Sequence, residues 1–174
     1  MRIISGKNKG RIIKAPDNLP VRPTTDMAKE ALFNILENRY YINKKKVLDL
    51  FSGTGNIAFE FASRGAVNIT AVDQHFHCCN FITKTATKLN YKIDVRKMEC
   101  LDFLEKTKAT FDIIFADPPY EFKHYEKLKN IILTKELVNQ DGCLIMEHDA
   151  NAKFDGENMD LRKYGSVHFS IFTL

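Results

Sequence analysis

The motif Asp117-Pro-Pro-Tyr120 follows the apolar segment 111–116 and has the residue types needed to hold a planar amine. An exocyclic amine on a nucleic-acid base is a poor nucleophile, because its lone pair is delocalised into the ring. If the Asp117 carboxylate and the Pro118 carbonyl each accept one N–H bond, the nitrogen can pyramidalise and aim its lone pair at a methyl carbon. Pro118 and Pro119 stiffen the loop and offer no competing N–H donors, and Tyr120 offers a face for base stacking. We predict that these four residues form the catalytic site of a base-amine methyltransferase.

A second motif, Asp49-Leu-Phe-Ser-Gly-Thr-Gly55, lies where an apolar strand is expected to turn into a helix. Gly53 and Gly55 let the backbone pass close beneath a ligand. A phosphate site needs amide donors and a positive helix end, whereas Asp49 places a carboxylate there, which suits an ammonium group. S-adenosylmethionine carries an ammonium on its methionine tail and has no phosphate. Asp73 lies 24 residues further on, at the end of the next strand, where an acid can bind ribose hydroxyls. The predicted cofactor is therefore S-adenosylmethionine.

The segment Glu99-Cys-Leu-Asp102 follows the third expected strand and is positioned to cover the adenine ring. An equally weighted alternative makes Cys100 and Leu101 core residues and Asp102 a helix cap. From the residues alone, the predicted cofactor site comprises Asp49, Phe51, Ser52, Gly53, Gly55, Asn56, Asp73, Gln74, Cys100 and Leu101. No metal site is predicted.

The elements that position these motifs follow from hydrophobic patterning. From Lys46 onward short apolar segments alternate with amphipathic ones, which predicts βαβ units and a parallel sheet. The expected strands are 47–51, 69–73, 93–97, 111–116 and 143–147, and the expected helices are 56–64, 75–90, 101–106 and 125–135. Ahead of them, a helix is expected to open after Thr24 or Thr25, either of which can cap it. Two further strands, 161–164 and 167–173, are too close together for a crossover and must pair antiparallel. We predict an α/β fold with a seven-stranded, mostly parallel sheet, helices on both faces and a C-terminal antiparallel hairpin, by analogy the Rossmann-like class I methyltransferase fold.

The bulk composition agrees with one globular domain spanning 1–174. Apolar residues make up 44% and charged residues 28% of the 174 residues. The absence of a run of about 18 apolar residues or of a secretory signal predicts a cytoplasmic protein with no membrane segment. Four cysteines without Cys-x-x-Cys spacing are expected to be free thiols.

Positive charge is concentrated at the N-terminus, where residues 1–22 contain six Lys and Arg against one Asp. Strands at 2–5 and 11–14 would form a basic β-hairpin ahead of the catalytic core, 23–174. Because this charge lies next to the predicted site, we expect RNA phosphates to bind Arg2, Lys7, Lys9, Arg11 and Lys14. The alternative is an ordinary solvated hairpin.

Motifs along nearly the whole chain resemble one family. They are Arg2-Ile-Ile-Ser-Gly6 with Gly10-Arg11, Arg22-Pro-Thr-Thr-Asp26 with Glu30-Ala-Leu-Phe-Asn34, Asp49 to Gly55, Ser63-Arg-Gly-Ala66, Asp117 to Tyr120 and Lys163-Tyr-Gly165. This set is similar to bacterial small-subunit (16S) ribosomal RNA guanine-N2 methyltransferases of the RsmD type.

The resemblance implies S-adenosylmethionine as cofactor, guanine N2 as target and ribosomal RNA within a small-subunit particle as substrate. It also implies that Arg22, Thr24 and Thr25 lie over the methionine end of the cofactor. The sequence departs from the family at Asn56-Ile-Ala-Phe59, where Gly-Ala-Leu-Gly is common, and at Asp73, where the acid is often Glu. We expect both departures to affect cofactor affinity rather than activity.

Other functions fit part of the pattern. Methylation of adenine N6 in DNA or RNA, or of a glutamine side chain, uses a similar motif, but those enzymes prefer Asn at its first position. A nicotinamide oxidoreductase would leave Asp117-Pro-Pro-Tyr120 without a role, and a non-catalytic RNA-binding assembly factor of the same fold would not need Asp49, Asp73 and Asp117. We therefore predict a monomeric ribosomal RNA guanine-N2 methyltransferase.

Overall fold

The computed structural model describes residues 1–16, 19, 25–119, 121–155 and 159–174. Of the predicted site residues, Arg22, Thr24 and Tyr120 lie outside the described residues. The helices are α1 (Asp26–Arg39), α2 (Asn56–Ser63), α3 (Phe76–Leu89), α4 (Cys100–Lys106) and α5 (Tyr125–Thr134). The strands are β1 (Lys46–Leu50), β2 (Asn68–Asp73), β3 (Ile93–Lys97), β4 (Phe111–Ala116), β5 (Val138–His148), β6 (Met159–Tyr164) and β7 (Val167–Thr173).

Over the described residues the strands form a seven-stranded sheet in the order β3-β2-β1-β4-β5-β7-β6. Strands β1 to β5 pair in parallel, and β7 runs antiparallel between β5 and β6. The mostly parallel sheet with a C-terminal antiparallel hairpin is therefore confirmed. The chain moves outward from β1 through β2 to β3 and then returns to the other side at β4. In such a sheet the crevice for a ligand lies at the carboxyl ends of the strands on either side of this reversal.

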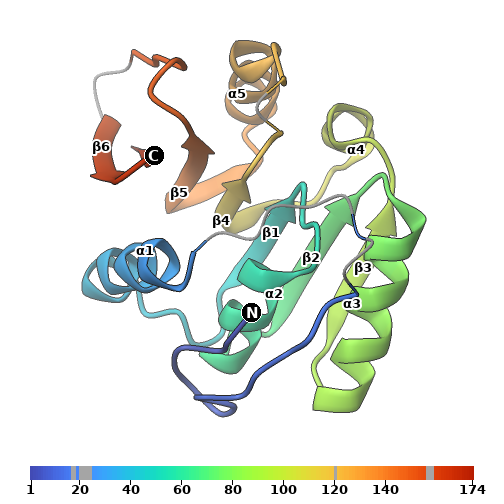
Figure 1. Cartoon of the computed structure of the whole chain (residues 1–174). Helices are drawn as coiled ribbons and strands as arrows, with labels where there is room; N and C mark the ends of the chain where they lie inside the picture. Colours follow the sequence, from blue (N-terminus) through green and yellow to red (C-terminus); the bar gives the residue numbers. More distant parts are fainter. Residues whose placement is uncertain (17–18, 20–24, 120, 156–158) are drawn as a thin grey trace.

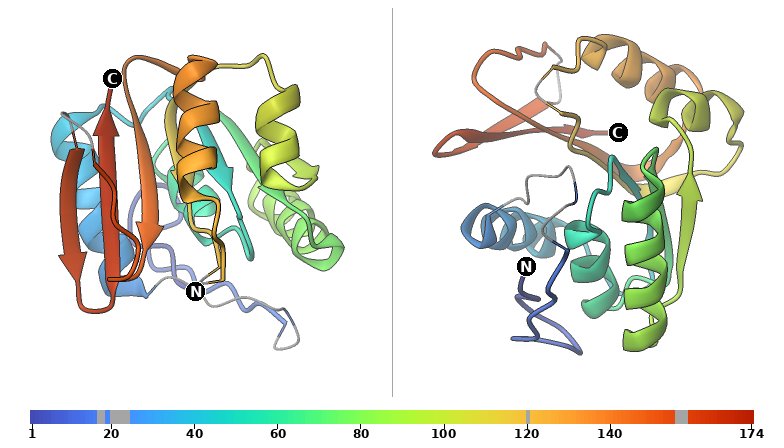
Figure 2. Two further views of the ribbon diagram at one scale, coloured as in Figure 1. Left: turned by 90° about the horizontal axis from the view of Figure 1, so that it is seen from above. Right: turned by 45° about the vertical axis from the view of Figure 1, so that its right-hand side comes forward.

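Helices cover both faces of the sheet (Figure 1). One core cluster joins α1, α2 and α3 to one face, and the other joins α4 and α5 to the opposite face, with the sheet between them (Figure 2, right). Because side chains alternate along a strand, every second residue of each strand faces α1 to α3. Over the described residues, none of these helices is both long and apolar enough to cross a bilayer.

The N-terminal segment pairs antiparallel, as predicted, but over a shorter stretch than two strands. It contains one bridge, Arg2 with Ile12, beside a backbone hydrogen bond of 2.9 Å from Ile3 N to the Arg11 carbonyl. Ile3 and Ile13 are buried and hold the segment against the core of the α1–α3 face. Apolar burial therefore adds to this short antiparallel pairing in fixing the segment.

Strand β5 begins at Val138 rather than at the predicted Cys143. Val138 pairs with Phe111, and a register irregularity follows before Ile113 pairs with Cys143. The intervening residues Asn139–Asp141 are polar, so hydrophobic alternation did not reveal them as strand. All four cysteines are buried and free of disulfides, as predicted.

Candidate active site

A cavity of about 370 Å³ opens at the carboxyl ends of the parallel strands, at the point where the strand order reverses. It is lined by Thr25, Asp49, Phe51, Ser52, Gly53, Thr54, Asn56, Ile57, Asp73, Gln74, His75, Glu99, Cys100, Phe115, Asp117, Pro118, Pro119, Glu121, Phe122, Glu147, Ser166 and Val167. The structure thus brings the predicted cofactor motif and the described part of the predicted catalytic motif into one cavity. Of the described residues predicted for these two motifs, Gly55 and Leu101 do not line it.

The loop between β1 and α2 is a tight turn with three residues of positive φ. These are Phe51 at 58°, Gly53 at 53° and Gly55 at 75°. Gly55 donates to the Ser52 carbonyl at 2.7 Å, and a Cβ at this position would lie 2.9 Å from Ile82 Cγ1. Gly55 therefore shapes the floor of the site, because a side chain there would push the loop away from α3.

Asp49 lines the cavity and is almost fully buried, with 1% of its surface exposed. Its Oδ2 accepts a hydrogen bond of 3.1 Å from the Ala58 amide. Burial raises the pKa of Asp49 to about 8; the Ala58 hydrogen bond opposes this rise, and the nearby acids Asp117 and Asp73 add to it. A cationic group entering the cavity would favour the charged carboxylate.

Asp73 connects the two loops that border the cavity. Its Oδ2 accepts from Gly53 N and its Oδ1 from His75 N, both at 2.8 Å. Each carboxylate oxygen has a second lone pair for a ligand. Asp73 therefore holds the glycine loop in place, a structural role that sequence reasoning missed, and also lines the space beside it.

Four acids project from the carboxyl ends of adjacent strands, and they are Asp73 of β2, Asp49 of β1, Asp117 after β4 and Glu147 of β5. The residues two positions earlier, Ala71, Val47, Phe115 and Ile145, all pack in the core of the α1–α3 face. Since side chains alternate along a strand, the four acids lie on that same face of the sheet. Sequence reasoning did not single out Glu147, although its signal was the same as for the other three: an acid ending an apolar strand.

The segment that was expected to cover an adenine ring begins α4. Cys100 is buried and lines the cavity, and its Sγ accepts from the Phe51 amide at 3.3 Å. Leu101 does not line the cavity, and it packs against the same core cluster to which Cys100 belongs. A cofactor contact by Leu101 therefore stays a prediction. The helix cap is Glu99, which accepts from the Asp102 amide at 3.0 Å, and not Asp102.

Thr25 is the N-cap of α1, and its hydroxyl accepts from the Ala28 amide at 3.2 Å. It lines the cavity, so the start of α1 borders the site. The sequence left the cap open between Thr24 and Thr25, and the structure assigns it to Thr25.

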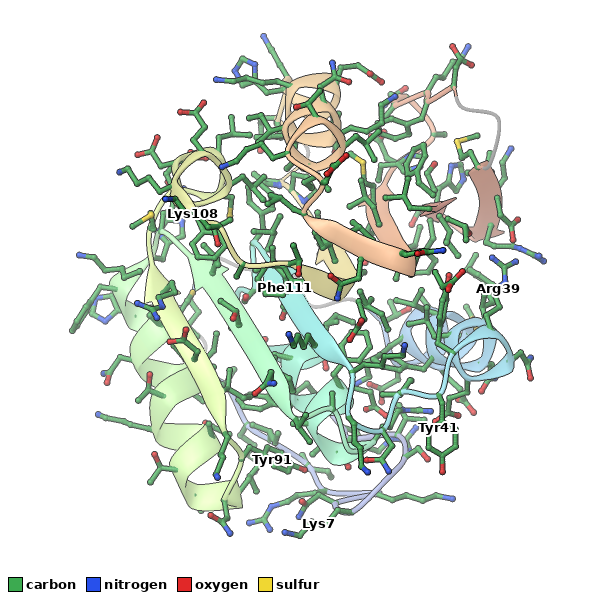
Figure 3. All side chains as sticks on the ribbon, turned by 180° about the vertical axis from the view of Figure 1, so that it is seen from behind. Lys7, Arg39, Tyr41, Tyr91, Lys108 and Phe111 are labelled. Atoms are coloured by element: carbon green, nitrogen blue, oxygen red, sulfur yellow. The ribbon has the colours of Figure 1, made fainter. Side chains whose placement is uncertain are left out.

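The five basic residues predicted to contact RNA, Arg2, Lys7, Lys9, Arg11 and Lys14, are all exposed. Arg2 pairs with Asp26 at 3.3 Å, close to the start of α1. The Lys7 amide, in contrast, donates to the carbonyl of Ser63, the last residue of α2. Because α2 begins at the cavity and has 8 residues, Lys7 lies about 12 Å along the helix from it. The expectation that the whole basic segment lies next to the site is therefore wrong for its tip, where Figure 3 shows Lys7 near Tyr91.

Solved structures share this architecture. The structure described as "Putative methyltransferase yhhF from Escherichia coli" has a TM-score of 0.85 and 26% identity, and the match covers 99% of this chain and 97% of that one. A 16S rRNA N2 methyltransferase of Thermus thermophilus, RsmC, in complex with AdoMet and guanosine, has a TM-score of 0.73 and 17% identity, covering 89% of this chain and 45% of that one. The fold is that of the class I S-adenosylmethionine-dependent methyltransferases.

Sequence comparison places the chain in a family. Residues 1–173 match the family described as "Conserved hypothetical protein 95", and the chain belongs to this family. It is 33% identical over 184 residues to "Putative rRNA methyltransferase YlbH" of Bacillus subtilis, a match covering 99% of this chain and 98% of the relative. It is also 32% identical over 149 residues to "Ribosomal RNA small subunit methyltransferase D" of Buchnera aphidicola, covering 84% of this chain and 77% of the relative.

Proposed function

We propose that this protein transfers a methyl group from S-adenosylmethionine to the exocyclic N2 amine of a guanine in small-subunit ribosomal RNA. The observation that carries the proposal is that Asp117, Pro118 and Pro119 line the same cavity as Asp49 and Asp73. A site for an amine and a site for a cationic cofactor are thus continuous. Relatives that span most of the chain carry the name of ribosomal RNA methyltransferases, which supports the RNA substrate.

The cavity fits the cofactor in its residue types. The buried Asp49 carboxylate suits the ammonium of the methionine part, and Asp73, with a free lone pair on each oxygen, suits the ribose hydroxyls. Gly53 leaves the cofactor room to approach the backbone. When bound, S-adenosylmethionine supplies a methyl group activated by attachment to a sulfonium.

The Asp117 loop prepares the nucleophile. The carboxylate accepts one N–H bond of the amine and the Pro118 carbonyl accepts the other, so the nitrogen lone pair turns toward the methyl carbon. The amine nitrogen would become acidic on gaining the methyl group and would have to lose a proton. Asp117, already hydrogen-bonded to one of the amine protons, is positioned to receive that proton or pass it to water. Tyr120 follows in the motif, and we propose that it stacks on the base.

The N-terminal segment gives the RNA a second point of contact. Its exposed Lys and Arg side chains begin at the cavity, near Arg2, and continue to Lys7 at the far end of α2. A polyanion bound along this line would be held on one side of a nucleotide that enters the cavity. A structured RNA within a ribosomal particle, rather than a free nucleotide, fits such an extended contact.

The decisive assay measures transfer of labelled methyl groups to small ribosomal subunits that lack the modification, followed by digestion to nucleosides. Labelled N2-methylguanosine is expected, and Asp117→Ala should lower its rate by about a hundredfold or more. Asp94→Ala, which removes an exposed acid on β3, is the matched control and should retain the rate. Label on adenosine would keep the amine chemistry and overturn the base, while cofactor binding without any label would point to an assembly factor.

A further inference from the structure

The carboxyl end of β5 brings a second acid to the side of the predicted catalytic loop. Ala116 of β4 pairs with Met146 of β5, so the next residues along the two parallel strands, Asp117 and Glu147, are neighbours. Their α-carbons are separated by one strand spacing, about 4.8 Å. Both side chains lie on the α1–α3 face and both line the cavity.

Glu147 lies away from the cofactor motif and beside apolar surface. On its other side β5 pairs with β7, where Glu147 is opposite Phe169, and Ser166 and Val167 at the start of β7 also line the cavity. Figure 2 (left) shows the turn between β6 and β7 at the same end of the sheet as the arrowhead of β5. Phe122 of the loop after β4 lines the cavity on the side of the cofactor motif, where it packs edge-on against Phe51. Glu147 is thus a mostly buried acid, 8% exposed, in a partly apolar compartment next to Asp117.

The edge of a guanine base matches two neighbouring carboxylates. Guanine presents two donors side by side, the N1–H and the N2 amine, whereas adenine presents an amine beside N1, which is an acceptor. Asp117 together with the Pro118 carbonyl uses the two N–H bonds of the amine, which leaves N1–H for a further acceptor. A carboxylate facing adenine N1 would meet a lone pair instead, at a cost typical of a buried polar mismatch.

We propose that Glu147 accepts the N1–H of the target guanine and thereby selects guanine over adenine, a role that rests on the proposed function. Asp117 positions the amine, a task that either base would satisfy. Glu147 reads the adjacent ring atom, which only guanine presents as a donor. Glu147 is therefore a specificity-determining residue, and the base preference arises from β5 rather than from the Asp117 motif.

The test compares two nucleosides that share the 2-amine and differ along the N1–C6 edge. Guanosine has N1–H beside a 6-oxo group, and 2-aminopurine riboside has a bare N1 acceptor beside C6–H. The difference at C6 is the same for every variant, so a change in preference on substitution of Glu147 reports on N1. Binding of each to protein saturated with S-adenosylhomocysteine is measured by nuclear magnetic resonance titration, for the wild type, Glu147→Gln and Glu147→Asp. The exposed Glu105→Gln on α4 is the control.

The wild type and Glu105→Gln are expected to bind guanosine at least tenfold more tightly than 2-aminopurine riboside. Glu147→Gln should reduce this preference to threefold or less, because its amide can also donate to a bare N1. Glu147→Asp keeps the charge and should keep the direction of the preference. Affinity for S-adenosylhomocysteine should stay within twofold in all variants.

An equal preference in the wild type and Glu147→Gln, or no preference in the wild type, overturns the role of Glu147. Failure of the proposed function gives a different result, namely no N2-methylguanosine from the wild type in the ribosomal-subunit assay. The two proposals can therefore fail separately.

Discussion

The Lys29 ammonium lies 3.6 Å from Glu60 Oε2, and both side chains are almost fully buried. Lys29 Nζ also donates to Asn56 Oδ1 at 2.7 Å and to the Arg2 carbonyl at 2.6 Å. Asn56 is the first residue of α2 and lines the cavity. One buried cation therefore connects α1, the N-terminal segment and the edge of the proposed cofactor site.

Glu60 completes this connection from the other side. Its two carboxylate oxygens accept from the Ile4 and Ser5 amides at 2.8 and 3.0 Å, and Arg64 Nε donates to Oε1 at 2.8 Å. Burial lowers the pKa of Lys29, and the Glu60 carboxylate opposes that effect. The N-terminal segment is thus fixed by charge-assisted hydrogen bonds as well as by its two buried isoleucines.

Replacement of Lys29 by Met should destabilise the protein by about 2–3 kcal/mol, because the buried Glu60 carboxylate would lose one of its two cations and keep only Arg64. For a chain of this size the melting temperature should fall by roughly 4–12 °C. Thermal unfolding measures this, and amide hydrogen exchange at Ile4 and Ser5 should speed up. Lys108→Met, at an exposed position near α4 (Figure 3), should leave both unchanged. A Lys29→Met protein that melts within about 2 °C of wild type would contradict the structural role.

The start of α1 could be predicted from the sequence, but the burial of Lys29 within it could not. The start of α1 followed from a capping threonine, but Lys29 was not recognised as buried, although it shares a helix face with Leu32, Phe33 and Leu36 at spacings of 3, 4 and 7. A lysine on an apolar face is normally expected to extend to water. Only the tertiary arrangement, which brings Glu60 and Asn56 to its end, shows that it does not.

The cavity illustrates the same limit. Asp49, Asp73 and Asp117 could be found because each follows a short apolar strand, and parallel strands must end at one edge. Glu147 carries the same local signal, but its pairing with Asp117 depends on the strand order. Ser166 and Val167 reach the cavity only because β7 returns antiparallel beside β5, which fixes their register in a way no local pattern reveals.

Asp49 should make cofactor affinity depend on pH. With a pKa of about 8 the carboxyl is mostly protonated in the empty site at pH 6, and binding of an ammonium group must release that proton. The affinity for S-adenosylhomocysteine should therefore rise between pH 6.0 and 7.5, by up to about tenfold per pH unit. Calorimetric titrations in buffers of different ionisation enthalpy measure both the affinity and the proton release.

Asp49→Asn is the control for this pH dependence. The affinity of this variant for S-adenosylhomocysteine should be weaker and should not change with pH, whereas an unchanged rise would assign the titration to another group.

The folding stability of the ligand-free protein should change with pH in the opposite sense. The unfolded carboxyl ionises at 3.8 and the folded one at about 8, so the folded state holds the extra proton between these values and loses stability as pH rises. The ligand-free Asp49→Asn protein should therefore gain melting temperature over wild type at pH 7.5 more than at pH 5.

Gly55→Ala should impair cofactor binding through backbone geometry. The added Cβ would lie 2.9 Å from Ile82 Cγ1 and 3.1 Å from Phe59, at a φ of +75°. The left-handed conformation alone would cost an alanine roughly 1–2 kcal/mol of folding stability. The clash of its Cβ with Ile82 and Phe59 would in addition displace the glycine loop. We expect at least a tenfold loss of S-adenosylhomocysteine affinity.

Gly10→Ala separates these two effects. Gly10 has a φ of +80° and nothing within 4 Å of its added Cβ, so it carries the conformational cost without the clash. It should lose stability by a similar conformational amount while cofactor affinity stays within twofold. Equal losses of affinity in the two variants would show that global destabilisation, and not the shape of the loop, is responsible.

Removal of three charges from the N-terminal segment should weaken binding to ribosomal particles without affecting the cofactor. In Lys7→Ala/Lys9→Ala/Arg11→Ala, each lost phosphate contact should reduce the slope of log affinity against log salt concentration by about 0.7–0.9. The loss of three contacts should thus reduce the magnitude of this slope by about 2 to 3. Filter binding of small ribosomal subunits across a salt series measures this, and S-adenosylhomocysteine affinity should remain at the wild-type value because the segment tip lies away from the cavity.

The matched control removes the same number of charges from the opposite face of the sheet. Lys106, Lys108 and Lys127 are exposed on or near α4 and α5, and alanine at all three should leave the salt slope unchanged. If both triple variants reduce the slope equally, the particle responds to net charge alone and the N-terminal segment is a solvated surface. A loss confined to the N-terminal variant would locate an RNA contact at the tip of the segment, beside Ser63 at the end of α2, because the three removed charges lie there.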